Sequence, residues 1–325
     1  MNDRPALRPD LAVGEALRAV ARDILAEARA ALASEASGQR RHSIDARAGH
    51  SPEEGSSARA ALENPGNSEA EAVHDFRRAM KRWRALLRLF EPFLGDEARK
   101  LRDEARDLAA ALTGARNAQS ALDALADLEA HGLALSRGAI AGLRERIEKI
   151  RRTAETTTLN ADMRARLGNA LATAESTVER WPLHLVTFDQ VADQLTRFYR
   201  DVRRRIPAEW PAADADELHE LRKRVVIHRY QMDIVEPLWP RFAKMWTDEA
   251  QRLRDRLGRH QDLLMLESLT APRQPLARWR SRLAEAIAKR RAKHVAGAAR
   301  IAARLFVEKP KTFRRRLAAM WRASA

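Results

Sequence analysis

An internal repeat constrains the fold of this chain more than any other feature of its sequence. When Val73 is aligned with Leu218, segments 73–122 and 218–267 keep one register without a gap. A shared register over so long a segment indicates a duplication, in which two copies of one structural unit pack as a pair. The matched pairs include His74 with His219, Arg77 with Arg222, Arg84 with Arg229, and Glu91-Pro92 with Glu236-Pro237.

The composition decides which structural class is duplicated. Ala, Leu, Arg and Glu dominate the sequence, and these residues have high helix propensity. Strand formers are sparse, with only 2 Tyr and no long run of Val, Ile or Thr. We therefore expect an all-α fold.

A second match, at a different offset, extends the repeat to the helices that precede it. Leu17, Arg22 and Ile24 correspond to Leu195, Arg200 and Val202. The two offsets differ by nearly the length of segment 34–68, which is rich in Ser, Gly and Asn and lacks periodicity. This segment is predicted to be a mobile loop inserted into the first copy.

Local signals divide the chain further. Ser68 with Glu71 and Asp214 with Glu217 have the spacing of capping boxes that open helices. Glu91-Pro92 and Glu236-Pro237 are predicted to end those helices, because the residue before proline avoids helical geometry. The predicted parts are a tail over 1–9, a first helical half over 10–182, a second over 183–308 and a basic tail over 309–325. The expected helices span about 11–33, 68–89, 96–130, 136–157, 161–180, 188–205, 214–235, 241–270 and 276–306.

The helix over 73–90 has one apolar face and one strongly basic face. Segment 74–88 holds a single acid, Asp75, although like charges one turn apart repel each other. Such a face is stabilised when an anion neutralises it, and Arg binds phosphate oxygens in bidentate fashion. The expected apolar positions are Phe76, Ala79, Met80, Trp83, Leu86, Leu87 and Phe90, followed in the second copy by Leu221, Val225, His228, Met232 and Val235.

These helices resemble the signature of the CHAD family, the conserved histidine α-helical domain. The resemblance rests on VHDFRRAMKRWRALLRLF at 73–90 and LHELRKRVVIHR at 218–229. A second family motif, around LGxxRD, has its counterparts in LTGARN at 112–117 and LGRHQD at 257–262. The first counterpart has Asn117 in place of the acid, and the second has Gln261 in place of the arginine.

The resemblance implies both a fold and a function. The fold is a pair of four-helix-bundle-like halves, related by a pseudo-twofold axis, with a basic central groove or channel. The function is non-catalytic binding of inorganic polyphosphate, with targeting to polyphosphate granules and no cofactor. The implied binding residues are His74, Arg77, Arg78, Lys81, Arg84, Arg88, His219, Arg222, Lys223 and Arg229, with Arg22, Arg200 and Arg116 as further members.

Two other functions remain open at this point. A nucleic-acid-binding protein would share the basic face, although no helix-turn-helix or zinc-finger spacing is present. An enzyme acting on polyphosphate or a phosphoester could use His74 or His219 as acid or base. His219-Glu220 starts like the HExxH zinc motif, but Lys223 stands where the second His is needed, so no metal site is predicted.

Charge and composition also suggest the compartment. The chain has 60 Lys and Arg against 45 Asp and Glu, a net charge of +15 that favours phosphate-rich partners. It has no Cys and no apolar run long enough to span a bilayer, so a cytoplasmic protein is expected. Segment 278–294 is read as a solvated helix or as extra polyanion surface. The C-terminal tail is read as a frayed end, extra polyanion surface, or a membrane contact through Phe313, Leu317 and Trp321.

Overall fold

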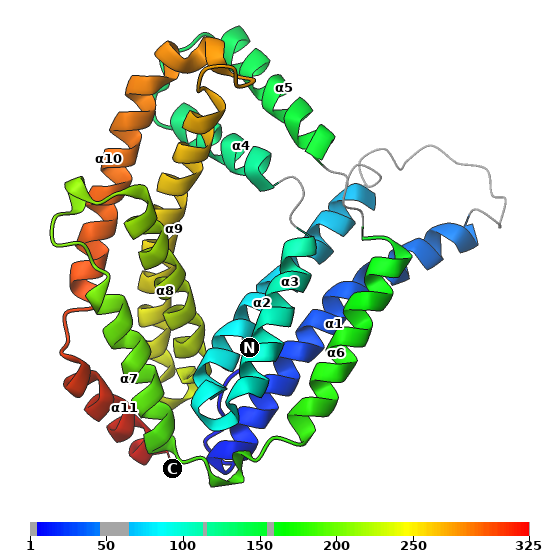
Figure 1. Cartoon of the computed structure of the whole chain (residues 1–325), viewed down its shortest axis with the longest axis vertical. Coiled ribbons are helices and arrows are strands. Elements are labelled where there is room, and N and C mark those ends of the chain that lie inside the picture. Colours follow the sequence, from blue (N-terminus) through cyan, green and yellow to red (C-terminus); the bar gives the residue numbers. More distant parts are fainter. Residues whose placement is uncertain (1–4, 46–64, 113–115, 155–158, 325) are drawn as a thin grey trace. The chain divides into compact units, whose positions relative to one another are not determined.

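The computed structural model describes residues 5–45, 65–112, 116–154 and 159–324. These residues form α-helices joined by short turns and 3-10 helices, and no strand occurs among them (Figure 1). The predicted all-α fold is confirmed. The chain divides into two compact units. Unit 1 comprises Met1–Leu112 and Thr158–Val186, and unit 2 comprises Thr113–Thr157 and Thr187–Ala325.

Unit 1 is built from four helices, α1 (Val13–Asp45), α2 (Pro65–Leu94), α3 (Asp96–Ala111) and α6 (Ala161–Glu179). Helix α1 packs against α2 and α6, and α2 packs against α3. Three aromatic side chains pack together in the core of unit 1. Trp181 stacks on Trp83 with ring centroids 5.8 Å apart, and it makes an edge contact with Phe90 at 5.2 Å. The apolar face predicted for α2 is confirmed, since all seven of its residues are buried.

Part of unit 2 repeats this arrangement of helices. Helix α7 (Phe188–Arg204) packs against α8 (Ala215–Ile234) and α11 (Pro310–Ser324), and α8 packs against α9 (Pro240–Leu269). The capping box predicted at Asp214 and Glu217 opens α8. The 3-10 helices η3 (Trp210–Ala212) and η4 (Glu236–Leu238) flank α8, and η4 contains the Glu236-Pro237 stop that the sequence predicts.

The rest of unit 2 is a second helical cluster. Helices α4 (Arg116–Glu129) and α5 (Arg137–Ala154) join the last turns of α9 and helix α10 (Arg280–Leu305), which follows the 3-10 helix η5 (Ala277–Trp279). Leu125, Ile147, Leu263 and Leu283 are fully buried in their shared core. The predicted first half, 10–182, includes α4 and α5, but contacts in the structure group both helices with unit 2.

The predicted loop over 34–68 is wrong at both ends. Helix α1 continues to Asp45, and α2 begins at Pro65, so Ser68 lies inside α2 and is not its N-cap. Proline is favoured in the first turn of a helix, where its missing N–H costs nothing, and Pro65 is the first residue of α2. Residues 46–64 lie outside the described part of the chain.

Two other helix boundaries also differ from the prediction. Pro92 does not end α2, which continues to Leu94. The helix stops at Gly95, whose φ of 58° is in the left-handed region and whose N–H donates to Glu91 O at 2.8 Å. The single helix expected over 96–130 is two helices, α3 and α4, separated by Leu112 and by residues 113–115, which are not described.

The predicted C-terminal tail is helix α11, the fourth helix of the bundle formed with α7, α8 and the first turns of α9. Phe313 and Leu317 are fully buried, and Trp321 stacks on Phe188 with ring centroids 4.6 Å apart. The frayed-terminus reading is therefore wrong. A membrane contact through these three side chains is also wrong, because Phe313 and Leu317 are buried in the core and Trp321 packs against Phe188.

Candidate functional site

The basic face of α2 contains a row of four cations along the helix. Arg77, Lys81, Arg84 and Arg88 follow each other at intervals of four, three and four residues, which places them on one stripe. All four side chains are partly exposed, while the opposite side of α2 is buried. The structure therefore places the four predicted residues together in unit 1.

A second row of cations lies on α3, next to α2. Arg99, Arg102 and Arg106 are spaced three and four residues apart and share one stripe of α3. This row does not stand out in the sequence, because acids are interspersed with it. The i, i+3, i+7 spacing of the arginines is the signal that could have found it.

Arg84 links the two rows and is the most informative side chain in unit 1. It is partly buried, and burial together with the charges of Arg106 and Arg102 lowers the pKa of its guanidinium group. Its Nε atom is buried and has no hydrogen-bond partner among the described residues. We call Arg84, Arg102 and Arg106 the arginine cluster. Three guanidinium groups that repel each other form a site that favours an anion.

Carboxylates partly balance the cations of α3. Arg102 donates to Glu91, and Arg106 forms ion pairs with Asp103 at 3.2 Å and with Asp107 at 3.0 Å. More than half of the Arg106 side chain is exposed, and such surface pairs contribute little and are easily exchanged for a stronger anion. Arg84 has no corresponding ion pair to a carboxylate among the described residues.

The other predicted residues of unit 1 differ in their surroundings. His74 is exposed, and Arg78 is exposed with Asp75 at 3.5 Å. Arg22 makes a bidentate pair with Glu179 of α6, which raises the pKa of the Arg22 guanidinium group. The pair directs Arg22 to the α1–α6 contact, so it serves the packing of unit 1 in this structure.

The predicted residues of the second copy lie in unit 2. His219, Arg222, Lys223 and Arg229 are on α8, and Lys223 is paired with Glu220 at 2.6 Å. Arg229 lies 3.5 Å from Asp233 and stacks over the ring of Tyr230 at 4.2 Å. Arg200 is exposed on α7, and Arg116 is the first residue of α4, where its side chain lies outside the described part of the chain.

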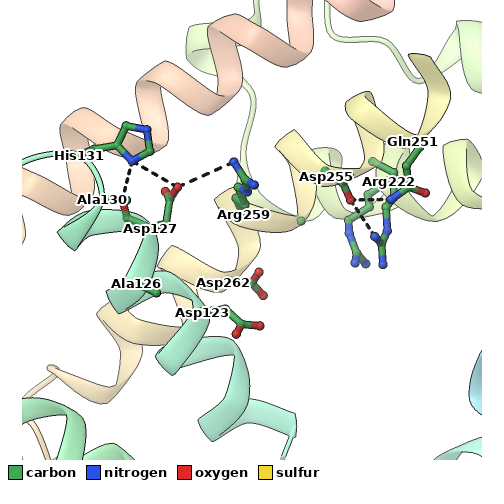
Figure 2. Close-up of a pocket in the computed structure, with 12 residues that line it drawn as sticks. Asp123, Ala126, Asp127, Ala130, His131, Arg222, Gln251, Asp255, Arg259 and Asp262 are labelled. Carbon is green, nitrogen blue, oxygen red and sulfur yellow. Dashed lines mark hydrogen bonds and ion pairs between the residues drawn. The ribbon is translucent and has the colours of Figure 1, made fainter. Parts of the chain in front are cut away.

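A pocket of about 770 Å³ opens in unit 2 between α4, α9 and Arg222 of α8. Figure 2 shows that its charges are mixed: Asp123 and Asp262 lie near each other, and Arg259 points toward Asp127. Arg254 and Gln251 both donate to Asp255, at 2.7 and 2.8 Å. Acids and bases in this pocket therefore largely neutralise each other.

Asp127, at the edge of this pocket, is the centre of a buried ionic network. Arg290 of α10 donates twice to its carboxylate, at 2.6 and 2.7 Å, and His294 Nε2 lies 2.8 Å from it. Burial alone would raise the pKa of Asp127, but the hydrogen bonds from Arg290 and His294 outweigh burial and hold that pKa well below its usual range. The network fixes α4 against α10, and sequence spacing gave no signal for it.

The arrangement of basic helices can be compared with known proteins. The family model described as "CHAD domain" matches residues 56–271, which is more than half of the chain. The chain belongs to the CHAD domain family. A crystal structure of the CHAD domain from the plant Ricinus communis matches with a TM-score of 0.57 and 20% identity, covering 97% of this chain and 94% of that chain. At this identity the likeness shows the fold alone, and no curated relative matches the chain.

The second CHAD motif also has a visible role in unit 2. Leu257 is buried, and a side chain at Gly258 would place its Cβ 3.4 Å from Nε of Arg222. The guanidinium group of Arg222 on α8 therefore lies against Gly258 of α9, at a distance that a small side chain would also tolerate. In the first copy, Leu112 is buried, and Thr113–Ala115 lie outside the described residues.

Two further features of the described residues bear on the kind of chemistry. No group of three or more His, Asp or Glu side chains in that part of the CHAD chain is arranged to hold a metal ion. None of the described helices combines the length and apolar character needed to span a membrane.

Proposed function

We propose that this CHAD domain binds inorganic polyphosphate without catalysing a reaction on it. The observation that carries the proposal is the arginine cluster of unit 1. In this cluster Arg84 is partly buried and lies close enough to Arg102 and Arg106 for their charges to lower its pKa. The α2 residues His74, Arg77, Arg78, Lys81 and Arg88 extend this surface, and α8 presents its counterpart in unit 2 through His219, Arg222, Lys223 and Arg229.

A linear phosphate polymer suits such a surface physically. Polyphosphate carries about one negative charge per phosphorus atom, and a row of cations along a helix meets successive phosphates. Each guanidinium group can donate two parallel hydrogen bonds to phosphate oxygens. Binding also removes the repulsion between neighbouring cations, so the ligand relieves a cost that the unliganded site carries.

The aromatic side chains favour polyphosphate over single-stranded nucleic acid. Proteins that hold single strands without sequence preference stack bases on exposed aromatic rings. Phe76, Trp83 and Phe90 of α2 are all buried in the core of unit 1. The basic face of α2 therefore offers charge without a stacking platform from these rings.

Competition distinguishes the two polyanions. Labelled long-chain polyphosphate is titrated with the protein in near-physiological salt, and unlabelled polyphosphate or duplex DNA of equal total charge is added. We expect polyphosphate to displace the label at a concentration at least about tenfold lower than DNA does. Equal displacement would show a non-specific polyanion binder and contradict the proposal.

A hydrolytic role for His74 or His219 is the remaining alternative. Its test is release of inorganic phosphate from long-chain polyphosphate, measured with and without Mg²⁺. We expect no release above that of a buffer blank. Release that disappears in a His74→Gln or His219→Gln variant would replace the binding proposal with an enzymatic one.

Association with polyphosphate granules, in the cytoplasm, is the cellular counterpart of this proposal. A fluorescent fusion of the whole chain is expected to coincide with granules stained for polyphosphate. The fusion should become diffuse when Arg84 and Arg106 are both replaced by Gln. An unchanged pattern in that variant would mean that the arginine cluster does not direct the localisation.

A further inference from the structure

The repeat makes the two basic helices directly comparable, residue by residue. The α2 row of Arg77, Lys81, Arg84 and Arg88 corresponds in α8 to Arg222, Val226, Arg229 and Asp233. The first copy therefore has four cations where the second has two cations, an apolar residue and an acid. The duplication kept the helix but changed its charge.

Two positions of the neighbouring helix also lack the positive charge that they have in unit 1. The positions of Arg102 and Arg106 on α3 are occupied in α9 by Thr247 and Gln251. Thr247 is buried, and its hydroxyl group donates to Lys244 O at 3.2 Å. Gln251 donates to Asp255 at 2.8 Å. Neither residue can supply the positive charge that its counterpart supplies in unit 1.

Arg229, one of the two arginines that α8 shares with the α2 row, forms an ion pair in unit 2. Arg229 corresponds to Arg84, and it pairs with Asp233, the residue that stands where unit 1 has Arg88. Only 15% of the Arg229 side chain and 5% of the Asp233 side chain are exposed. A pair buried to this degree supports the packing of α8, and an incoming phosphate would have to break it.

Other cations of α9 are also paired with acids of unit 2. Lys244 lies 2.9 Å from Asp248, Arg252 lies 2.6 Å from Glu249, and Arg254 lies 2.7 Å from Asp255. Helix α9 thus contains basic residues whose charge is balanced by a neighbouring carboxylate, whereas Arg84 forms no ion pair with a carboxylate among the described residues and lies beside Arg102 and Arg106.

From these differences we infer that the two copies have diverged in function: the arginine cluster of unit 1 is the high-affinity anchor for the phosphate polymer, and the equivalent surface of unit 2 has become mainly structural. The inference rests on the proposed function. It adds Arg102 and Arg106 to the binding residues and predicts one strong site in a duplicated chain.

The test converts unit 1 to the residues of unit 2. The variant Arg88→Asp, Arg102→Thr, Arg106→Gln removes three positive charges from the first copy and adds one negative charge, which lowers its net charge by four. The matched control replaces Lys244, Arg252, Arg254 and Arg259 with Gln, which removes four positive charges from α9 of unit 2. Affinity for long-chain polyphosphate is measured for both variants and for the wild type in near-physiological salt.

We expect the unit 1 variant to bind at least about tenfold more weakly than the wild type, and the control to remain within about threefold. Equal losses, or no loss in the unit 1 variant, would overturn the inference while leaving polyphosphate binding intact. If the wild type itself failed to bind, the proposed function would fall, and with it the inference.

Circular dichroism establishes that both variants keep the helical content of the wild type. A single substitution keeps the test decisive if the unit 1 variant does not fold. Arg106→Gln changes an exposed side chain to the residue that unit 2 has at this position, and its control is Arg252→Gln, also exposed on α9. A loss of about threefold for Arg106→Gln, and none for the control, is expected. Equal affinities would overturn the inference.

Discussion

A single carboxylate, Asp127, holds together two helices that are far apart in the sequence, and 9% of its side chain is exposed. Its partners Arg290 and His294 are themselves buried, so removal of the carboxylate charge would leave a buried guanidinium group without compensation. Such a loss costs about 3–5 kcal/mol. We expect Asp127→Asn to lower the free energy of unfolding by that amount, measured by denaturant titration. Asp123→Asn, exposed one turn earlier on α4, should change it by less than about 0.5 kcal/mol.

The lowered pKa of Asp127 also predicts that the folded state loses stability at low pH. Because the folded state favours the carboxylate, its contribution is complete above the pKa of an unfolded Asp, about 3.9. The contribution is lost as pH falls below that value and through the still lower folded pKa. Asp127→Asn should therefore remove part of the loss of stability seen below about pH 4. A similar loss in the variant and the wild type would contradict this role.

His228 predicts a separate effect at milder pH. It is fully enclosed in the aromatic cluster of unit 2 and accepts a hydrogen bond from Trp246 Nε1 at 3.0 Å. Burial, with the nearby charge of Arg316, lowers the pKa of His228 to about 3. The folded state thus disfavours the protonated form, and stability is lost as pH falls from about 6.5 toward 3.

The measurement is the free energy of unfolding between pH 7 and pH 5. In wild type the His228 contribution should fall by up to about 1.4 kcal/mol per pH unit below pH 6.5. His228→Phe removes the titrating group while keeping an aromatic ring, so its curve should be shallower. Burial lowers the pKa of His260 to about 4. His260 therefore also contributes to the slope, and part of the slope should remain in the His228→Phe variant. An unchanged slope would show that His228 is protonated in the folded state.

At the scale of elements, α11 shows what the sequence pattern could not resolve. Its apolar positions are few and separated by arginines, which is typical of a solvated tail. In the structure Phe313 stacks on Tyr199 with ring centroids 4.2 Å apart and is fully buried. The rings that surround Phe313 come from α7, α8 and α9, and no local spacing reveals them.

Helix α11 therefore carries a prediction of its own. Phe313→Ala should destabilise unit 2 by about 3–5 kcal/mol, because it leaves a cavity in a packed aromatic cluster. Arg315→Ala, on the exposed side of the same helix, should change stability by less than about 0.5 kcal/mol. Thermal unfolding followed by circular dichroism compares the two. Equal melting temperatures would mean that α11 does not pack as described.

The helices that sequence did predict share a physical reason. Helix α2 has seven apolar residues on one side, and a face of this width can only be buried, so its position in a core follows from periodicity. The boundary at Pro92 was wrong because one proline near the end of a helix removes a single hydrogen bond, which the packing of the last turn offsets. Burial of a face is thus easier to predict than the residue at which a helix stops.

At the scale of the whole molecule, the repeat gave the helical frame but not the distribution of charge. The repeated His, Arg and Arg positions suggested equivalent contributions from both copies. The structure instead pairs Arg229 with Asp233 and leaves Arg84 beside Arg102 and Arg106. Such differences depend on the neighbours of each cation in space. The net charge of +15 shows that the chain attracts polyanions, and only the local pairing distinguishes the surface that would hold one.

When polyphosphate binds, the arginine cluster of unit 1 is expected to displace counterions that are condensed on the phosphate chain. The most direct measurement is the dependence of polyphosphate affinity on salt concentration, compared between the wild type and the double variant Arg84→Gln, Arg106→Gln. For linear polyanions the slope of log affinity against log salt changes by about 0.7–0.9 for each cation in contact. We predict a slope shallower by about 1.5 in the double variant. Parallel lines for the two proteins would place the bound phosphates elsewhere and contradict the account.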